Sequence, residues 1–336
     1  MDEKEKIIAV LKKYHYFLIG SHINPDGDSL GSELALASLL KRMGKKVAVV
    51  NPNSAPSIYN FLPYKDWITS SCEKDAAEVG IVLDCSEYER LEKVKNLFFS
   101  LPIVINIDHH ISNKKFGRIN FLNTSAGSTG EILYQIFKSF PEQLTKEEAL
   151  LLYVAILTDT NCFRFGTTAS THKIVSELLS YGLNPREIQE KIYSIPFLAV
   201  KLLELIFATI QINKKIAWGE ITKEMLNKIN STFGESEDIA QTDIFINYLC
   251  SIKDIEVAAL FKELDSSPID PTRYASQGEA GKIKVSLRSK NFINVNKIAQ
   301  AFNGGGHFRA SGCLVSGDIK EVEKKVIAEI EKEMES

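Results

Sequence analysis

Long hydrophobic runs are missing from this sequence. The longest wholly apolar stretch covers the nine residues 149–157, whereas a membrane-spanning helix needs about 20. The chain starts Met-Asp-Glu-Lys-Glu, without the basic start and apolar core that are typical of a signal peptide. We therefore expect a cytoplasmic protein that has no membrane partner.

Cysteine is also scarce. The 336 residues include five cysteines, an odd number, and no two of them form a Cys-x-x-Cys pair. This pattern argues against both a disulfide framework and a zinc–thiolate site. The simplest interpretation is a protein of a reducing compartment, in which the cysteines act as small core residues.

An excess of positive charge is absent as well. Lys and Arg total 40, Asp and Glu total 43, and the formal net charge is -3. A protein that coats long nucleic acid usually carries a strong positive excess, so we expect no long nucleic-acid partner. A local basic pocket is still compatible with this balance. The length suggests two domains at about 150 residues each.

The first half of the chain alternates between strand-like and helix-like segments. Short runs rich in Val and Ile predict buried strands at 16–20, 46–50, 80–83 and 102–107. Helical patterns lie at 30–43, 128–140 and 145–157. This alternation predicts a parallel sheet with helices on its faces.

The second half predicts another α/β unit. A helical stretch at 171–209, broken at two prolines, connects the halves. Strands are expected at 216–221, 255–263, 282–289 and 312–316. Helices are expected near 223–230, 239–252, 294–302 and 319–333, and the polar segment 265–281 reads as a surface loop. We therefore divide the chain into an N-terminal domain (1–185), a helical linker (186–212) and a smaller C-terminal α/β domain (213–336).

Acidic residues and histidines follow three of the predicted strands. Strand 16–20 is followed by a segment with His22, Asp26 and Asp28, strand 80–83 by Asp84, and strand 102–107 by Asp108-His109-His110. Carboxyl ends of parallel strands meet at one edge of a sheet, where ligands bind. Asp159, at the end of a predicted helix, is a further acid that can join them.

Such a concentration of carboxylates requires either protonation or cations. Histidine beside aspartate favours a transition ion over calcium. The candidate ligands are His22, Asp26, Asp28, Asp84, His109 and Asp159. They suffice for two ions if Asp84 bridges, and two ions about 3.5–4 Å apart suit phosphoryl displacement. Taken singly, each Asp is more often a helix cap or a turn residue, but that explanation would have to hold at three strand ends independently.

At Asp108-His109-His110 the sequence resembles the DHH phosphoesterase family. The resemblance extends over nearly the whole chain, in the right order, through the motifs His22–Ser29, Asp84, Asp159 and Gly304–His307. Within the family the chain is most similar to the stand-alone nanoRNase/pAp-phosphatase type. Those enzymes are cytoplasmic, use manganese, and act on very short RNA and on 3'-phosphoadenosine 5'-phosphate (pAp).

The resemblance implies a role for each candidate residue. One Mn²⁺ ion would be held by His22, Asp26 and Asp84, and the other by Asp28, Asp84, His109 and Asp159. Asp108 would orient the histidines, and His110 would face the scissile phosphate. The resemblance also implies an N-terminal DHH domain, a C-terminal DHH-associated domain, an active-site cleft between them, and a possible homodimer. The family often has Ala-Ala-Gly where this chain has Ala310-Ser311-Gly312, which leaves substrate choice open.

The C-terminal half contains candidate substrate-binding residues. The glycines Gly304, Gly305 and Gly306 allow backbone N–H groups to approach an anion, although a glycine run alone often only turns the chain. Arg288 lies on the polar face of a predicted strand and is either a bidentate phosphate ligand or a solvated arginine. The resemblance places Arg288 and His307 in a nucleotide pocket and Arg164 near the cleft.

The resulting hypothesis is a two-metal hydrolase whose partner is short RNA or a small nucleotide. It would cut very short oligoribonucleotides to mononucleotides and pAp to AMP, through Asp84, Asp108 and His110 at the reacting phosphate. The alternatives are a phosphodiesterase for cyclic di-AMP or linear diadenylate, a family II inorganic pyrophosphatase, and a catalytically silent nucleotide sensor.

Overall fold

The computed structural model describes residues 2–71, 77–233, 245–264 and 281–335, which fall into two compact units. The first unit is Met1–Ser194 and the second is Ile195–Ser336. Over these described ranges, no helix is both long enough and apolar enough to span a bilayer.

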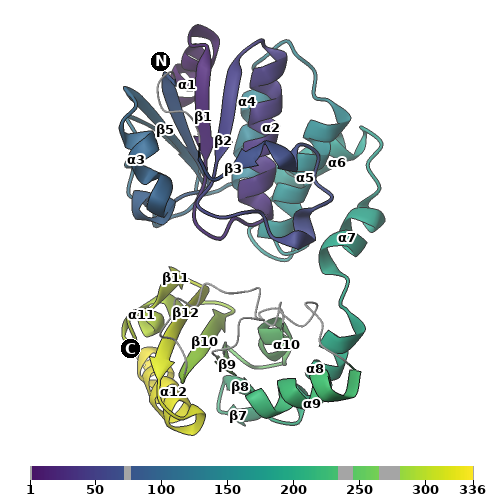
Figure 1. Ribbon diagram of the computed structural model, residues 1–336, viewed down its shortest axis with the longest axis vertical. Coiled ribbons are helices and arrows are strands. Elements are labelled where there is room, and N and C mark those ends of the chain that lie inside the picture. Colours follow the sequence, from purple (N-terminus) through teal and green to yellow (C-terminus); the bar gives the residue numbers. More distant parts are fainter. Residues whose placement is uncertain (1, 72–76, 234–244, 265–280, 336) are drawn as a thin grey trace. The chain divides into compact units, whose positions relative to one another are not determined.

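The first unit is built on a six-stranded sheet in the order β3-β2-β1-β4-β5-β6 (Figure 1). Its strands are β1 (Tyr16–Gly20), β2 (Lys46–Val50), β3 (Ile68–Thr69), β4 (Val79–Leu83), β5 (Ile103–Asp108) and β6 (Ile119–Leu122). Every neighbouring pair is parallel, which confirms the predicted architecture. The short strands β3 and β6 at its edges were not predicted, because they are brief and only partly buried.

Helices cover both faces of this sheet. The α-helices are α1 (Glu3–Lys13), α2 (Gly27–Arg42), α3 (Lys95–Phe99), α4 (Thr129–Phe137), α5 (Lys146–Asp159), α6 (Ala169–Leu179) and α7 (Pro185–Tyr193). Three 3-10 helices, η1 (Ser57–Tyr59), η2 (Lys65–Trp67) and η3 (Tyr88–Val94), lie in the connections. Alternation along β1 explains the two layers: Phe17 and Ile19 face the cluster of α2, α4 and α5, while Leu18 faces α3 and η3.

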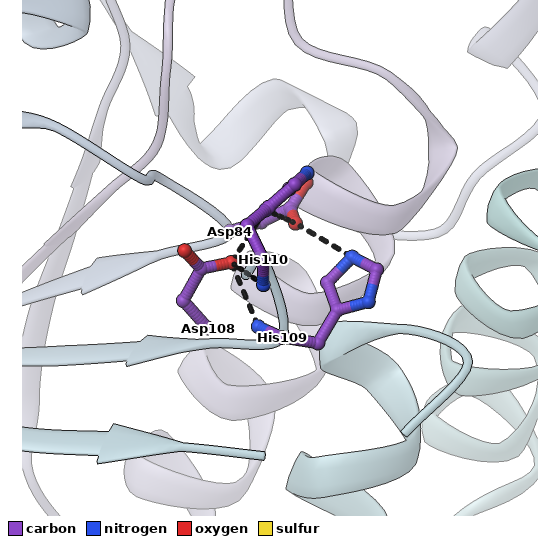
Figure 2. A group of neighbouring side chains, drawn as sticks. All are labelled: Asp84, Asp108, His109 and His110. Atoms are coloured by element: carbon purple, nitrogen blue, oxygen red, sulfur yellow. Dashed lines mark hydrogen bonds and ion pairs between the residues drawn. The ribbon is translucent and has the colours of Figure 1, made fainter. Parts of the chain in front are cut away.

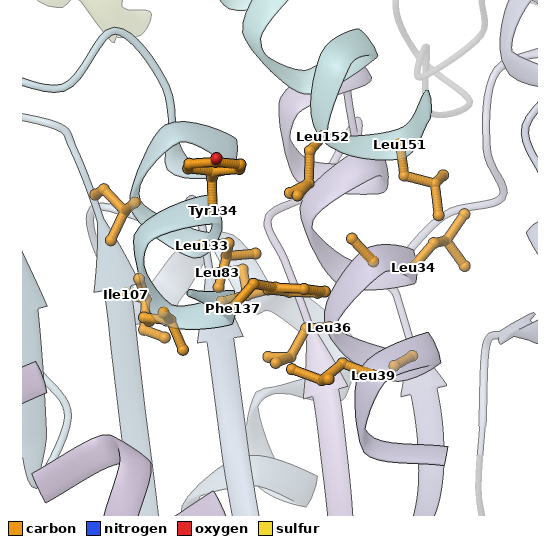
Figure 3. Packing of buried hydrophobic residues seen from close by; sticks show 14 of the residues in the cluster. Leu34, Leu36, Leu39, Leu83, Ile107, Leu133, Tyr134, Phe137, Leu151 and Leu152 are labelled. Atoms are coloured by element: carbon orange, nitrogen blue, oxygen red, sulfur yellow. The ribbon is translucent and has the colours of Figure 1, made fainter. Parts of the chain in front are cut away.

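The larger core cluster holds α2 rigidly in place. The leucines of α2 pack against side chains of α4, α5 and the strands, as Figure 3 shows. Gly31 of α2 lies so close to α5 that an added Cβ would be 2.4 Å from the carbonyl oxygen of Leu151. Asp28 lies in the first turn of α2 and Asp159 is the last residue of α5, so this packing also fixes both carboxylates.

The carboxyl ends of three central strands meet at one edge of the sheet. In the register, Gly20 of β1 pairs with Val82 of β4, and Leu83 of β4 pairs with Ile107 of β5. The residues that follow these strands therefore emerge side by side.

The second unit contains a mixed sheet in the order β11-β12-β10-β9-β8-β7. Its strands are β7 (Gln211–Asn213), β8 (Ile216–Ile221), β9 (Val257–Glu263), β10 (Lys282–Ser289), β11 (Gly305–His307) and β12 (Ala310–Ser316). Its helices are α8 (Phe197–Phe207), α9 (Lys223–Phe233), α10 (Ile246–Ser251), α11 (Val295–Gln300) and α12 (Ile319–Glu335). Phe261 of β9 faces α11 and α12, whereas Leu260 faces α8, α9 and α10, so this sheet is also covered on both faces.

The helices of the expected linker belong to different units. Ile188 and Ile192 of α7 join the first core, and Leu202 and Ile206 of α8 join the second. The division after Ser194 falls within the range 186–212.

Two expected segments differ or lie partly outside the described residues. Gly305–His307 was expected to be a loop but forms strand β11, because its glycines let the backbone pair closely with β12. The helix expected at 239–252 is described over α10 only, and residues 265–280 of the expected polar loop lie outside the described part.

Candidate metal centre

Six side chains that are far apart in the sequence converge at the carboxyl edge of the first sheet. His22, Asp26 and Asp84 each offer a ligand atom, and these atoms lie within 4.8 Å of one another. A second group with the same spacing contains Asp28, His109 and Asp159. The third group, Asp84 with Asp108, His109 and His110, is shown in Figure 2. All of the predicted metal ligands are therefore brought together.

Asp26 and Asp28 are placed by the start of α2. Oδ1 of Asp26 caps the helix by accepting a hydrogen bond from the Ser29 amide at 3.0 Å, while Oδ2 lies 3.9 Å from Nε2 of His22. A capping role and a ligand role are thus compatible, because each uses a different oxygen.

Asp84 lies between the two halves of the centre. Its backbone adopts a left-handed conformation with φ 53°, directly after β4, which turns its side chain into the cluster. Oδ2 lies 3.5 Å from Nε2 of His22, and Oδ1 lies 3.6 Å from Nε2 of His109. Oδ1 also lies 3.6 Å from Nδ1 of His110. The two oxygens of this carboxylate therefore face different candidate ligands, His22 and His109, as a bridging ligand requires.

Backbone carbonyls fix the orientation of both candidate histidine ligands. Nδ1 of His22 lies 2.7 Å from the carbonyl oxygen of Ile23, and Nδ1 of His109 lies 3.3 Å from that of Ala126. A carbonyl only accepts hydrogen bonds, so we assign the proton to Nδ1 and leave the lone pair on Nε2. Both lone pairs then point into the group of carboxylates, which is the arrangement of a metal-ligating histidine.

Nε2 of His109 provides a test of whether a metal ion fits. This atom is buried and has no hydrogen-bond partner among the described residues. It lies 3.2 Å from Oδ2 of Asp159 and 3.9 Å from Oδ2 of Asp28. Buried polar atoms are almost always satisfied, and a lone pair facing carboxylate oxygens is satisfied by a cation. The donor set thus fits a divalent ion.

The pKa shifts of the buried acids also favour a bound cation. Burial, followed by the charges of Asp84 and Asp159, raises the pKa of Asp28 well above its usual range. Burial also raises the pKa of Asp159 to about 7. Burial alone would raise the pKa of Asp84, but the His22 hydrogen bond and the nearby imidazoles hold it below its usual range. The cluster cannot be fully ionised without added positive charge.

His110 and Asp108 form a buried pair beside this cluster. Oδ1 of Asp108 lies 2.6 Å from Nδ1 of His110 and also accepts the backbone N–H of His109 at 2.8 Å. Asn113 donates to Oδ2 of Asp108 at 2.5 Å. Burial acts to lower the pKa of His110, but the hydrogen bond that it donates to Asp108 and the charge of Asp84 raise it to about 9. The neighbouring carboxylates therefore favour the protonated form of this imidazole.

The first turn of α4 also belongs to the site, although it was not predicted to. The N–H of Thr129 donates to Oδ2 of Asp28 at 2.6 Å, and its hydroxyl donates to Oδ1 of Asp84 at 3.1 Å. Ser128 caps this helix by accepting the backbone N–H of Glu131. Nothing in that local pattern says which carboxylates the helix start faces.

Arg90 is a second residue that the sequence analysis missed. Its carbonyl oxygen accepts the N–H of Ile23 at 2.7 Å, which fastens η3 to the loop after β1. Burial acts to lower the pKa of His22, but Asp84 and the charge of Asp26 together raise it, and the charge of Arg90 opposes that rise. Within the part of the chain that is described, the guanidinium makes no hydrogen bond or ion pair.

The predicted substrate residues divide between the units. Arg164 is exposed in the first unit, in a turn after α5 where residues 161–163 all have left-handed backbone angles. Its guanidinium carbon lies 5.8 Å from the centroid of the Phe165 ring. Arg288 and the glycine segment lie in the second unit.

In the second unit, two of the predicted substrate residues share one row of the sheet. Arg288 of β10 and His307 of β11 both pair with Ala310 of the intervening strand β12. A Cβ added at Gly304 would lie 2.3 Å from the Gly312 carbonyl oxygen, so that glycine is required by packing.

Gly306 and Gly305 differ in the space that a Cβ atom would have. A Cβ at Gly306 would be 2.6 Å from the Ala310 carbonyl oxygen, and the residue has φ +148°. At Gly305 the nearest atom is Oδ1 of Asn296, at 3.9 Å. Two of the three glycines are therefore explained by backbone packing, and Gly305 is not.

Comparison with known proteins gives concordant matches for both halves. The N-terminal domain of the DHH family matches residues 16–156, and the DHHA1 domain matches residues 227–336. The chain is 28% identical over 338 residues to a Thermus thermophilus protein named bifunctional oligoribonuclease and PAP phosphatase NrnA, covering 99% of this chain and 95% of that one. It is 27% identical to the Bacillus subtilis protein of that name, covering 93% of each.

Solved structures show the same fold. An exopolyphosphatase-related protein from Bacteroides fragilis superposes with a TM-score of 0.86 at 26% identity, covering 98% of this chain and 96% of that chain. RecJ from Thermus thermophilus, solved in complex with Mn²⁺, superposes with a TM-score of 0.53 at 12% identity, covering 99% of this chain and 55% of that one. The latter likeness concerns the fold alone.

Proposed function

The chain belongs to the DHH phosphoesterase family, with a DHH domain followed by a DHHA1 domain, and from this premise we propose that it hydrolyses short oligoribonucleotides and pAp with two divalent metal ions. The observation that carries the proposal is the convergence of six ligand atoms around Asp84, with the lone pair of His109 left unsatisfied. The names of the two relatives compared above supply the substrate class.

We assign one ion to His22, Asp26 and Asp84, and the other to Asp28, Asp84, His109 and Asp159. Imidazole and carboxylate donors together suit Mn²⁺, which we propose as the ion used. When bound, such ions lower the pKa of a coordinated water and stabilise charge on a phosphoryl group.

The residues around the ions have separate tasks in this scheme. Asp108 holds the ring of His110 and favours its protonated form, so His110 can donate a hydrogen bond to the phosphoryl or leaving oxygen and deliver a proton to it. Asp108 keeps the imidazole in place, since it also binds the backbone of the Asp-His-His segment. The guanidinium of Arg90 adds a positive charge on the His22 side.

We assign nucleotide recognition to Arg288 and the Gly304–His307 segment of the second unit, with Arg164 contributing from the first. Arg288 provides a planar donor group that matches a phosphate, and the glycine segment lets an anion approach the backbone without side chains in the way. The net charge of -3 offers no extended basic track, which favours short substrates over long RNA.

The test is a product analysis with purified protein and Mn²⁺. The substrates are pAp, linear diadenylate, cyclic di-AMP, pyrophosphate and an RNA length series, with products separated by chromatography. We expect AMP from pAp and mononucleotides from the shortest RNAs, with rates that fall as the RNA lengthens. Faster cleavage of cyclic di-AMP would select that alternative substrate, and orthophosphate from pyrophosphate alone would make the protein a pyrophosphatase. Nucleotide binding without turnover would make it a sensor.

A further inference from the structure

The start of α4 supplies hydrogen bonds to two carboxylates of the metal centre. The amides of Thr129 and Gly130 donate to Oδ2 and Oδ1 of Asp28 at 2.6 and 2.9 Å. Ser32 donates its hydroxyl to Oδ1 of the same carboxylate at 3.2 Å. The partial positive charge of a helix N-terminus stabilises an anion at this position. Asp28 is therefore held by three donors, two of which are backbone groups.

The hydroxyl of Thr129 acts on a different carboxylate. It donates at 3.1 Å to Oδ1 of Asp84, and this is the oxygen that faces His109 at 3.6 Å. The other oxygen of Asp84 faces His22. A carboxylate rotates about its Cβ–Cγ bond, and a donor on Oδ1 restrains most directly the oxygen that it binds. Thr129 is fully buried and cannot exchange this partner for bulk water.

The loop before α4 is itself locked. Oε2 of the buried Glu131 accepts the N–H of Gly127 at 3.0 Å and the hydroxyl of Thr171 at 2.9 Å. Ser128 caps the helix by accepting the amide of Glu131. The backbone at residue 129 therefore has little freedom to follow a shift of the carboxylates.

We propose that Thr129 is a positioning residue that sets the rotation of the Asp84 carboxylate and thereby supports the ion on the His109 side more than the ion on the His22 side. This inference rests on the proposed two-ion function. The hydroxyl can be removed without losing the amide that binds Asp28, so Thr129→Val isolates the bond to Asp84.

The experiment measures Mn²⁺ affinity in two single-site backgrounds. Asp26→Asn removes a ligand on the His22 side, and Asp159→Asn removes one on the His109 side. Thr129→Val is added to each, and free Mn²⁺ is followed by electron paramagnetic resonance during titration. We expect the affinity of the remaining ion to fall about 10- to 100-fold in the Asp26→Asn background and less than about threefold in the Asp159→Asn background.

Two further variants separate the hydroxyl from packing. Thr129→Ser retains the donor and should bind Mn²⁺ like the unsubstituted chain even if Thr129→Val proves poorly folded. Thr209→Val removes a hydroxyl that binds only backbone groups of the second unit, and should leave both affinities unchanged.

The outcomes distinguish this inference from the proposed function. Equal losses in both backgrounds, no loss in either, or a loss with Thr129→Ser as large as with Thr129→Val would overturn it. An unsubstituted chain that binds fewer than two Mn²⁺ ions would overturn the two-ion function and this inference together. Two bound ions with an unaffected Thr129→Val variant would overturn the inference alone.

Discussion

Nδ1 of His110 lies 2.6 Å from Oδ1 of Asp108, within a pocket where the aspartate is completely buried. This bond holds the imidazole in the cationic form that the proposed mechanism requires. Asp108→Asn keeps the shape and an accepting oxygen but removes the negative charge. We expect kcat to fall about 10- to 100-fold while two Mn²⁺ ions remain bound. Steady-state kinetics and elemental analysis of the same sample check this.

Asp66→Asn serves as the matched control, since that aspartate is 90% exposed on η2 and its loss also removes one charge. It should retain full activity. Loss of bound metal from Asp108→Asn would show that Asp108 is a ligand and not a positioning residue.

Asp84 and Asp26 should differ in how many ions depend on them. Asp84 presents Oδ2 to His22 and Oδ1 to His109, whereas among the described histidines Asp26 approaches only His22. Asp84→Asn should therefore weaken the binding of both Mn²⁺ ions and abolish activity. Asp26→Asn should weaken the binding of one ion. Equilibrium dialysis with elemental analysis gives the stoichiometry. If Asp84→Asn still binds two ions and turns over substrate, Asp84 is not the bridge.

The convergence at the metal centre was predictable because it follows from topology. Carboxyl ends of parallel strands share an edge, so Asp84 and Asp108-His109-His110 had to meet whatever the details of the loops. Asp159 was harder to place, since it depends on where α5 ends relative to the sheet. Thr129 and Arg90 could not be predicted. Their local patterns, a helix start and a polar turn, occur widely and carry no information about tertiary partners.

The strands show the same difference between features that the local sequence encodes and features that depend on tertiary pairing. Long buried strands such as β1 and β4 have continuous apolar runs and were found within a residue of their ends. Strand β11 was missed because its Gly-Gly-His sequence has little strand propensity, and only its pairing with β12 makes it a strand.

Gly305 should be required for substrate binding and not for folding. A methyl group at Gly305 meets only Oδ1 of Asn296, a buried atom without a hydrogen-bond partner among the described residues. Gly305→Ala should therefore leave the Tm unchanged and raise KM for pAp about tenfold, by filling space beside the proposed anion-binding amides. Gly304→Ala is the matched contrast, because its methyl group overlaps the Gly312 carbonyl oxygen, and it should lower the Tm. An unchanged KM for Gly305→Ala would argue against anion binding by this segment.

Arg90 should contribute to substrate binding without contributing to metal binding. Its guanidinium has no partner among the described residues and lies close enough to His22 to oppose the rise in that pKa. We expect Arg90→Gln to lower kcat/KM about 10- to 100-fold, equivalent to the roughly 1.5–3 kcal/mol of a charge-assisted hydrogen bond, with Mn²⁺ stoichiometry intact. Arg90→Lys, which keeps the charge, should recover part of the loss. Full activity of Arg90→Gln would remove Arg90 from the site.

A buried acidic pair makes the second unit sensitive to pH. Glu220 of β8 and Glu323 of α12 are both buried, and the partly exposed Lys320 binds both carboxylates. Burial raises the pKa of Glu323 to about 7, and the neighbouring Glu220 adds to the shift. The folded chain thus holds this proton more tightly than the unfolded chain. The stabilisation from the protonated form is complete below the ordinary Glu pKa of about 4.3 and is lost as pH rises to about 7.

Glu323→Gln fixes the side chain in a neutral state and so removes this dependence. We expect the variant to exceed the unsubstituted chain in Tm by about 2–4 °C at pH 8, the shift that roughly 1 kcal/mol produces in a domain of about 150–250 residues, and to match it at pH 5. Scanning calorimetry of the full chain at both pH values measures the difference. Glu329→Gln, on the same helix and paired only with the exposed Lys332, is the control and should show no pH-dependent change. A Tm difference of the same size at pH 5 and pH 8 would mean that Glu323 keeps its ordinary ionisation in the folded chain.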